Sequence, residues 1–185
     1  MKRHEFVATR EDCLLLIVDI QQAMARVIAA WEEVVRKVNQ LTQAADVLGI
    51  PILLTEQYRK GLGETMPAVA AAIRSPRVFP KEHFSACLEP DFLSLVQSYH
   101  RRKIVLVGME THVCVLQTGL DLMKAGYHLQ LAADGVASRT TRNRDIAIDL
   151  LGKAGAVITS AEIIIFQWAV RANTEEFRKL LPIVK

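Results

Sequence analysis

The sequence predicts an α/β fold with three layers, in which a mostly parallel sheet has helices on both faces. Six short aliphatic runs, several bounded by Gly or Pro, have the continuous apolar character of strands that are buried on both sides. Longer segments with helical spacing of their apolar residues lie between these runs. Because the crossover between parallel strands is right-handed and carries a helix, this alternation predicts the layered arrangement. The expected strands are residues 14–20, 52–55, 78–79, 104–108, 129–132 and 157–159.

The helices are predicted from periodicity and from end signals. Apolar residues recur with helical spacing over Trp31–Leu48, and Gly49 is a favourable C-cap for that helix. After the fourth strand, a second helix is expected to begin with Thr111 as its N-cap. An apolar stretch without a regular period begins at residue 161, and an amphipathic helix is expected at 174–181.

Composition excludes several classes of protein. The chain has 185 residues, of which 51% are hydrophobic and 23% charged, so we expect one domain that spans residues 1–185. No apolar run reaches the roughly 20 residues of a membrane-spanning helix, so no membrane partner is expected. The formal net charge of +3 is spread along the chain and does not call for nucleic acid. The charged N-terminal residues form no targeting segment, and a cytoplasmic location is expected.

Cofactor signals are missing from the sequence. Three cysteines, without a Cys-x-x-Cys pair or zinc-finger spacing, disfavour both a disulfide scaffold and a structural zinc. No glycine-rich dinucleotide fingerprint or P-loop follows an expected strand, which disfavours NAD and ATP. We therefore expect no cofactor and no metal, and a small molecule as the substrate.

Three chemically active side chains lie at the ends of expected strands. Asp19 lies at the end of the first strand, Lys81 follows the third and Cys114 follows the fourth. In open parallel sheets, ligands bind beyond the carboxyl ends of the strands. Singly, each residue has a structural explanation, as a helix cap, a loop lysine or a buried thiol. Together, an acid, a base and a thiol at one edge favour a site.

Cys114 is the most informative of the three. With Thr111 as N-cap, Cys114 falls in the first helical turn, where free backbone N–H groups and the helix dipole favour a thiolate. A nearby ammonium such as Lys81 favours the thiolate further. Asp19 can then take the thiol proton and pass it to a leaving group. The three residues predict acyl transfer by a cysteine hydrolase.

Four segments resemble the isochorismatase-like hydrolases, a superfamily that includes nicotinamidases and N-carbamoylsarcosine amidohydrolase. They follow the family's order and approximate spacing, and the resemblance implies the superfamily's Rossmann-like fold. It also implies a homo-oligomer, because members commonly form dimers, tetramers or octamers. The apolar stretch after residue 161 favours a subunit interface as well. The four segments are residues 16–21 (LIVDIQ), 81–86 (KEHFSA), 107–115 (VGMETHVCV) and 133–139 (ADGVASR).

The resemblance also implies roles for individual residues. Asp19, Lys81 and Cys114 match the family's catalytic triad. The backbone N–H groups of Glu110 and Cys114 match its oxyanion hole. A cis peptide bond is implied between Met109 and Glu110.

Two departures from the family narrow the expected activity. Nicotinamidases carry metal-binding histidines after the second strand, whereas residues 54–63 contain none, and nicotinamidase activity is disfavoured. Glu56 and Gln57 could offer oxygens to a hard cation, but two such ligands make a poor transition-metal site. Hydrolysis of the vinyl ether isochorismate needs no thiol, so Cys114 favours an amide or carbamoyl substrate. The TEQY segment at 55–58 resembles the subgroup called isochorismatase domain-containing proteins.

Substrate contacts are expected from the loops after the second and third strands and from the segment around Cys114. Gln21 can instead orient Asp19 or cap the following helix, and His112 can instead pack or bond a neighbouring backbone group. Asp134 is expected to belong to a turn. The expected substrate contacts are Gln21, Gln57, Tyr58, Phe84, Thr111, His112 and Thr118.

These observations together predict a metal-independent cysteine hydrolase that acts on a small amide-like or carbamoyl compound. The intermediate would be a thioester at Cys114, with Asp19 as general acid and base and Lys81 as electrostatic support. Two alternatives stay open. One is an isochorismatase-type vinyl-ether hydrolase that does not depend on Cys114, and the other is a non-hydrolytic binding or redox-sensing protein with the same fold.

Overall fold

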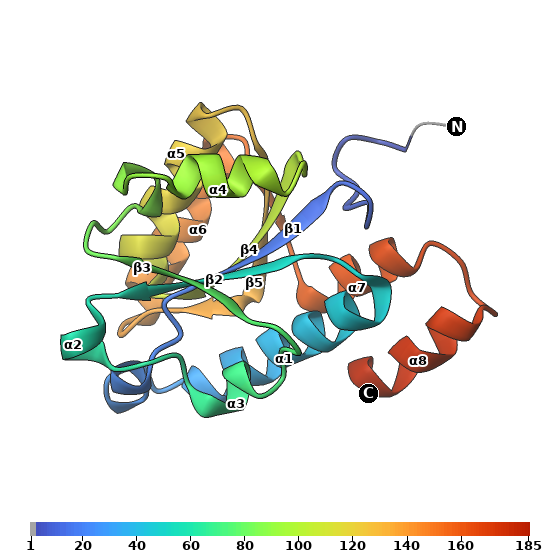
Figure 1. Cartoon of the computed structure of the whole chain (residues 1–185), viewed down its shortest axis with the longest axis horizontal. Coiled ribbons are helices and arrows are strands. Elements are labelled where there is room, and N and C mark those ends of the chain that lie inside the picture. The colour runs from blue at the N-terminus through green and yellow to red at the C-terminus, as the bar shows by residue number, and fades with distance from the viewer. Residues whose placement is uncertain (1–2) are drawn as a thin grey trace.

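Six parallel strands form the centre of the molecule, in the order β3-β2-β1-β4-β5-β6 (Figure 1). The computed structural model describes residues 3–185. All neighbouring pairs in the sheet are parallel, which confirms the predicted α/β class. The strands are β1 (Cys13–Val18), β2 (Ile52–Gln57), β3 (Arg77–Lys81), β4 (Lys103–Met109), β5 (His128–Ala137) and β6 (Val157–Thr159).

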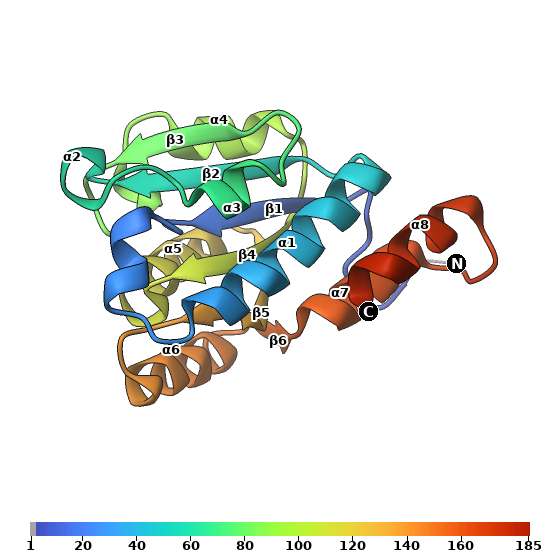
Figure 2. The same ribbon diagram turned by 90° about the horizontal axis from the view of Figure 1, so that it is seen from below.

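Helices cover both faces of the sheet (Figure 2). On one face lie α1 (Trp31–Leu48), α3 (Pro67–Ala70), α7 (Ala161–Ala169) and α8 (Glu175–Val184). On the other lie α4 (Phe92–Ser98), α5 (Leu116–Lys124) and α6 (Thr141–Lys153). Shorter turns connect them: α2 (Arg59–Leu62), the 3-10 turns η1 (Gln22–Arg26) and η2 (Ala86–Leu88), and the π-helical turn η3 (Thr111–Val115).

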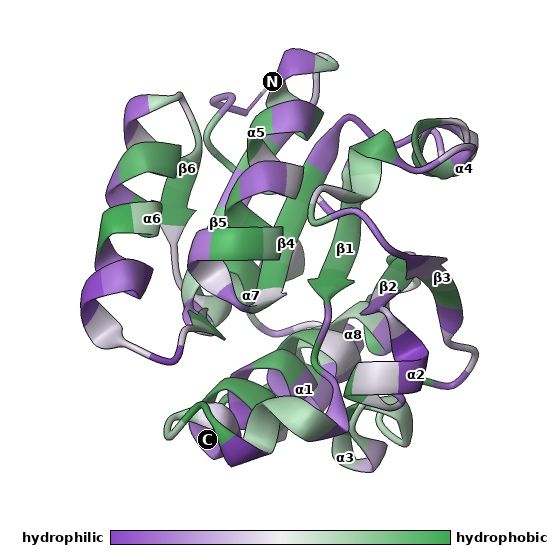
Figure 3. Cartoon of the chain, turned by 90° about the vertical axis from the view of Figure 1, so that its left-hand side faces the viewer, coloured by the Kyte–Doolittle hydropathy of each residue, from purple (hydrophilic) through white to green (hydrophobic). Residues whose placement is uncertain are grey.

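The alternation of side chains along β1 explains how one apolar strand serves two cores. Leu15 and Ile17 belong to the core beneath α1, whereas Leu14 and Leu16 belong to the core beneath α5. All six residues of β1 are buried, and β4 beside it is buried along its whole length. Viewed from the side in Figure 3, β1 and β4 are hydrophobic strands between two layers of helices.

Three expectations about the elements are corrected. The strands β3 and β6 are not fully buried, because both lie at edges of the sheet and half or more of their residues are at least partly exposed. The first strand ends at Val18 instead of residue 20, because Asp19 adopts a left-handed backbone with a φ of 52° and leaves the ladder. The stretch after residue 161 is not irregular, since Ser160 caps a regular helix, α7, by accepting from the backbone N–H of Ile163.

Two helix predictions are confirmed. The helix α1 has the expected bounds, and Gly49 ends it with a left-handed φ of 67°. The C-terminal amphipathic helix, α8, begins after Thr174, whose side chain caps it, and runs three residues further than expected. No helix in the described part of the chain is long and apolar enough to cross a membrane.

Candidate active site

The site begins where β1 ends. The backbone N–H of Asp19 donates to the carbonyl of Thr55 at 3.2 Å, and the Thr55 hydroxyl donates to Asp19 Oδ1 at 2.7 Å. The sheet register pairs Val18 with Thr55, and this pairing brings the side chain of Thr55 in β2 next to the Asp19 carboxylate. The neighbouring strand β4 approaches so closely that a Cβ at Gly108 would lie 2.1 Å from the Val18 carbonyl oxygen, and Gly108 has a φ of 142°.

Lys81, the last residue of β3, reaches across β2 to Asp19. Its Nζ lies 2.7 Å from Asp19 Oδ2, and neither side chain is exposed. Nζ also donates to Gln57 Oε1 at 2.6 Å and to the carbonyls of His83 and Phe84 at 3.2 and 3.3 Å. A buried ion pair is stable only when its remaining hydrogen-bonding capacity is satisfied in this way. The ammonium is therefore fixed beside the carboxylate.

Cys114 lies in the π-helical turn η3, and the expectation that Thr111 caps a regular helix is wrong. The cap position is Glu110, which has an extended backbone, and the Glu110 carbonyl accepts from the backbone N–H of Val115 at 3.3 Å. This bond spans five residues, so the turn is wider than an α-helical one. The turn places Cys114 at the entrance of α5 with only 5% of its surface exposed.

The surroundings of Cys114 raise the pKa of its thiol to about 12, whereas the sequence led us to expect a lowered pKa. Burial is the largest cause and the Asp19 carboxylate adds to it, while the Lys81 ammonium acts in the opposite direction. The sulfur also lies 4.0 Å from Gln57 Oε1, another electron-rich group. At neutral pH the resting group is therefore a thiol, and it needs a base before it can act as a nucleophile.

Glu110 connects the turn to the end of β5. Its carboxylate lies 2.7 Å from Nε of Arg139 and 3.2 Å from Nδ1 of His112, and it accepts from the Arg139 backbone N–H at 3.4 Å. His112 Nδ1 also lies 3.0 Å from the Ser138 hydroxyl. The Met109–Glu110 peptide bond is cis, as the resemblance implied.

Two of the expected substrate contacts are committed to the protein itself. Gln21 is fully buried; its Nε2 donates to the carbonyls of Gln57 (3.0 Å) and Gly63 (2.6 Å), and its Oε1 accepts from the Gln57 backbone N–H (2.8 Å). Thr118 is also fully buried, and its hydroxyl accepts from the backbone N–H of Ala86. Both side chains fix the loops around the site, and these polar atoms already have partners within the protein.

The other five expected contacts remain candidates. Gln57 lies between the Lys81 ammonium and the Cys114 sulfur, and its Nε2 is held by the Glu82 carbonyl. Tyr58, directly after β2, and Phe84, in the loop after β3, are about half exposed. Thr111 is fully buried, and its hydroxyl has no hydrogen-bond partner among the described residues. His112 is partly exposed beside Glu110.

The side-chain oxygens of Glu56 and Gln57, which are the possible ligands for a hard cation, already have partners within the protein. Glu56 Oε1 accepts from both the backbone N–H and the hydroxyl of Thr65, and Oε2 lies 3.6 Å from Nε of Arg59. Asp134 lies within β5 instead of a turn, and it accepts from the backbone N–H of Ala161 at the start of α7. For a metal ion as well, the described residues offer no cluster of three or more His, Cys, Asp or Glu side chains that could act as ligands.

Sequence reasoning missed two features of the site. The bond from Thr55 to Asp19 depends on the register of β1 and β2, which no local pattern reveals. The pairing of Glu110 with Arg139 was also missed, although both residues lie in segments that the resemblance had singled out. The available signal was the position of both residues within two residues of the ends of neighbouring parallel strands.

Comparisons with known proteins agree with this fold and identify the family. The family model described as "Isochorismatase domain" matches residues 13–163. A secreted isochorismatase effector of Phytophthora sojae is 35% identical, over 93% of this chain and 84% of that protein. A structure described as the MAR1 ribonuclease of Caenorhabditis elegans is 32% identical, with a TM-score of 0.88 over 95% of this chain and 91% of that one. The Escherichia coli ycaC gene product, described as an octameric hydrolase of unknown specificity, shares the fold at 19% identity, with a TM-score of 0.88 over 98% and 94% of the two chains.

Proposed function

Because the chain belongs to the isochorismatase family of hydrolases, we propose that it is a metal-independent cysteine hydrolase that acts on a small amide or carbamoyl compound. One observation carries this proposal. The buried pair of Asp19 and Lys81 lies so close to Cys114 that both charges act on the pKa of its thiol. An acid–base group, a cation and a nucleophile in one dry site are the parts that covalent acyl transfer requires.

In the proposed first half-reaction, Asp19 takes the proton from Cys114 Sγ while the sulfur attacks the substrate carbonyl carbon. The carbonyl oxygen becomes an oxyanion that accepts from the backbone N–H groups of Glu110 and Cys114. The C–N bond then breaks, the leaving nitrogen takes the proton from Asp19, and a thioester remains on Cys114. The raised pKa of the resting thiol fits this order, because proton removal is coupled to attack on a bound substrate.

The second half-reaction returns the enzyme to its starting state. Asp19 takes a proton from a water molecule, which attacks the thioester carbon, and the C–S bond breaks. The sulfur recovers its proton from Asp19, and the product leaves as an acid. Lys81 balances the carboxylate charge in a site without solvent, and the Thr55 hydroxyl keeps the carboxylate in place.

Metal independence is supported by the chemistry of the donor set. Both oxygens of Glu56 are engaged with Thr65 and Arg59, and Gln57 Oε1 is engaged with Lys81. A cation there would have to displace an existing partner from each oxygen. Oxygen ligands of this kind without imidazole also suit transition metals poorly.

The two alternative functions are distinguished by Cys114. A vinyl-ether hydrolase keeps its activity without the thiol, because protonation by Asp19 would be the central step. A redox sensor needs a thiolate at neutral pH, and a thiol with a pKa of about 12 is a poor one. Amide-type hydrolysis therefore accounts for more of the site than either alternative.

We also propose that the protein is a cytoplasmic homo-oligomer. Ile163, Phe166 and Val170 leave about half of their surface exposed along and just after α7, which fits an interface with a second copy. The neighbour from Escherichia coli is described as octameric. Cys13, Cys87 and Cys114 are all free, as is usual in a reducing compartment. Sedimentation that gave only a stable 20.7 kDa species would refute the oligomer.

The test of the function is the intact mass of the protein after brief incubation with small amides, carbamoyl compounds and isochorismate, compared with the Cys114→Ala variant. An acyl adduct on the wild type alone supports the thioester, and its mass identifies the acyl group. Consumption of isochorismate at equal rates by both proteins, without any adduct, would replace the proposal with vinyl-ether hydrolysis. An Asp19→Asn variant serves as the control, since both hydrolytic mechanisms need that carboxylate.

A further inference from the structure

A buried ammonium group lies at the end of the sheet opposite the candidate active site. Lys103 is the first residue of β4 and is only 7% exposed. Its Nζ donates to the Val7 carbonyl at 2.6 Å. That is the one hydrogen bond of Nζ among residues 3–185, and no carboxylate of these residues lies within ion-pair distance of it. Because a buried charge without a counter-ion is strongly unfavourable, this position calls for an anion.

The neighbours of Lys103 in the sheet do not supply the negative charge. The register pairs Lys103 with Cys13 of β1 on one side and with His128 of β5 on the other. Burial raises the pKa of the Cys13 thiol to about 11, so this group is neutral at neutral pH. An imidazole is either neutral or positive and never a counter-ion for an ammonium. The charge of Lys103 therefore stays unbalanced within the sheet.

A cavity of about 360 Å³ lies beside Lys103. Its charged lining residues are Arg3, Arg102, Lys103, Glu5 and Asp12. Asp12 Oδ1 accepts from the backbone N–H of Arg102 at 3.3 Å, so this carboxylate is already partly engaged. The exposed side chain of Arg102 has no hydrogen-bond or ion-pair partner in the described part of the chain. Three cations against two carboxylates leave the lining with one positive charge in excess.

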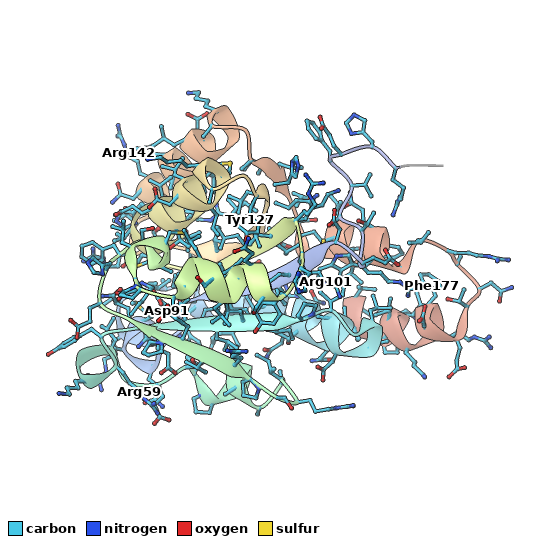
Figure 4. The ribbon with its side chains drawn as sticks, turned by 45° about the horizontal axis from the view of Figure 1, so that its top comes forward. Arg59, Asp91, Arg101, Tyr127, Arg142 and Phe177 are labelled. Atoms are coloured by element: carbon cyan, nitrogen blue, oxygen red, sulfur yellow. The ribbon has the colours of Figure 1, made fainter. Side chains whose placement is uncertain are left out.

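A second cavity, of about 260 Å³, adjoins the first, because Glu5 and His128 line both. Its apolar lining residues are Phe6, Met123, Tyr127, Leu129 and Val157. Figure 4 shows Tyr127 and Arg101, which precedes the basic cavity in the sequence, away from Arg59 at the other end of the sheet. A charged compartment beside an aromatic one is a common arrangement in sites for small organic ligands.

The N-terminal segment forms one wall of both cavities, and buried side chains fix it. Lys103 holds the Val7 carbonyl, and Gln130 Nε2 donates to the Phe6 carbonyl at 2.9 Å. The backbone N–H of Ala8 donates to Gln167 Oε1 at 2.8 Å. Three consecutive residues are thus bound by side chains from β4, β5 and α7. The two cavities therefore have defined walls before any ligand binds.

We propose that these two cavities form a second binding site, which takes a small aromatic oxyanion. The oxyanion accepts from the Lys103 ammonium and the Arg102 guanidinium, and the ring lies between Phe6 and Tyr127. A carboxylate and a phosphate ester share this chemistry, since both form charge-assisted hydrogen bonds with these donors. The site is separate from Cys114 and does not depend on the proposed hydrolytic activity.

A purely structural role for Lys103 predicts different behaviour. In that case Nζ serves only to hold the Val7 carbonyl, and the wild type binds an aromatic anion no better than a neutral molecule of the same shape. A binding site predicts that the anion is preferred and that the preference depends on both Lys103 and Arg102. Removal of Arg102 leaves the bond to Val7 intact, so its effect on binding separates the two roles.

The experiment is isothermal titration calorimetry of the full chain in Tris buffer that contains neither phosphate nor carboxylate, at constant ionic strength. The probes are benzoate, phenyl phosphate and the neutral benzyl alcohol. The variants are Lys103→Met, Arg102→Gln and, as a matched control, Arg142→Gln. Arg142 is likewise an exposed arginine, but it lies in the first turn of α6 and lines neither cavity. Thermal unfolding shows that each variant is folded.

We expect the wild type to bind benzoate or phenyl phosphate at least about tenfold more tightly than benzyl alcohol, and the tighter anion identifies the head group. Lys103→Met should weaken the binding of that anion about tenfold or more, Arg102→Gln should weaken it severalfold, and Arg142→Gln should leave it within about twofold. Equal affinity for the anions and the alcohol, or wild-type affinity in both cavity variants, would overturn the site. If Lys103→Met does not fold, Arg102→Gln decides.

Discussion

The ammonium of Lys81 lies 2.7 Å from the carboxylate of Asp19, and no solvent reaches either side chain. The two residues are 62 positions apart in the sequence and belong to opposite sides of β2 in the sheet. In such a place each charge depends on the other, because an unpaired buried charge is strongly unfavourable.

Replacing Lys81 by Met should therefore lower the free energy of unfolding by about 3–5 kcal/mol, since it leaves the Asp19 carboxylate buried without its cation. Urea denaturation measures the change. The double variant Lys81→Met, Asp19→Asn should recover much of the stability while remaining inactive, because it no longer buries a charge. A single variant as stable as the wild type would mean that water enters the site.

The hydroxyl of Thr55 should matter to both activity and stability, because it holds the Asp19 carboxylate in place. Thr55→Val keeps the shape of the side chain but removes the hydrogen bond to Asp19 Oδ1. We expect kcat to fall about tenfold, with a loss of about 1–3 kcal/mol in the free energy of unfolding. Thr42, a buried threonine of α1, provides the matched control, because Thr42→Val removes a bond to the Asn39 carbonyl far from the site. Equal kcat in the two variants would contradict a positioning role for Thr55.

Alkylation of Cys114 by iodoacetamide should accelerate steadily with pH. Only the thiolate reacts, and with a pKa of about 12 its fraction rises about tenfold for each unit between roughly pH 7 and pH 10. The same raised pKa makes the stability of the fold depend on pH. The folded state holds the thiol proton more tightly than the unfolded chain, so the contribution of Cys114 to the free energy of unfolding is full below about pH 9 and is lost as the pH rises toward 12. A rate that levels off near neutral pH would show a pre-formed thiolate instead.

Gly108 should tolerate no side chain. Gly108→Ala would place a Cβ 2.1 Å from the Val18 carbonyl oxygen, which neither paired strand can accommodate without moving. We expect a loss of more than about 3 kcal/mol, or failure to fold. Gly126→Ala is the control, since its φ of 92° is equally left-handed but no atom lies within 4 Å of the added Cβ. Gly126→Ala should lose only about 1 kcal/mol of stability. Thermal unfolding of both variants measures the difference.

The sequence was sufficient for the elements whose signals are local. Continuous apolar runs identified β1 and β4, and Gly49 marked the end of α1. It overestimated the burial of β3, because a short apolar run looks the same at the edge of a sheet as at its centre. The topology rule for strand ends correctly directed attention to Asp19, Lys81 and Cys114, which the structure brings together.

The site differs from the sequence-based expectations because of contacts between segments that are distant in the sequence. Gln21 and Thr118 have suitable chemistry for a substrate, but backbone groups of neighbouring loops use it first. The thiol of Cys114 was expected to be acidified by a helix start, yet it lies in a π-helical turn where burial and the Asp19 carboxylate raise its pKa. Each outcome depends on distances between segments that are far apart in sequence, and no local pattern contains them.

The strand order of the sheet has a consequence for how activity is acquired during folding. Asp19 follows β1, Lys81 ends β3 and Cys114 follows β4, so no two of them come from strands that are both consecutive in the sequence and adjacent in the sheet. A partly folded chain that has paired only β1 and β2 holds one member of the set, and the ammonium arrives only when β3 adds to the edge. Loop closure over such separations is slow compared with local helix formation. Recovery of turnover in a refolding experiment would thus report completion of four strands at once, later than the return of helical circular dichroism.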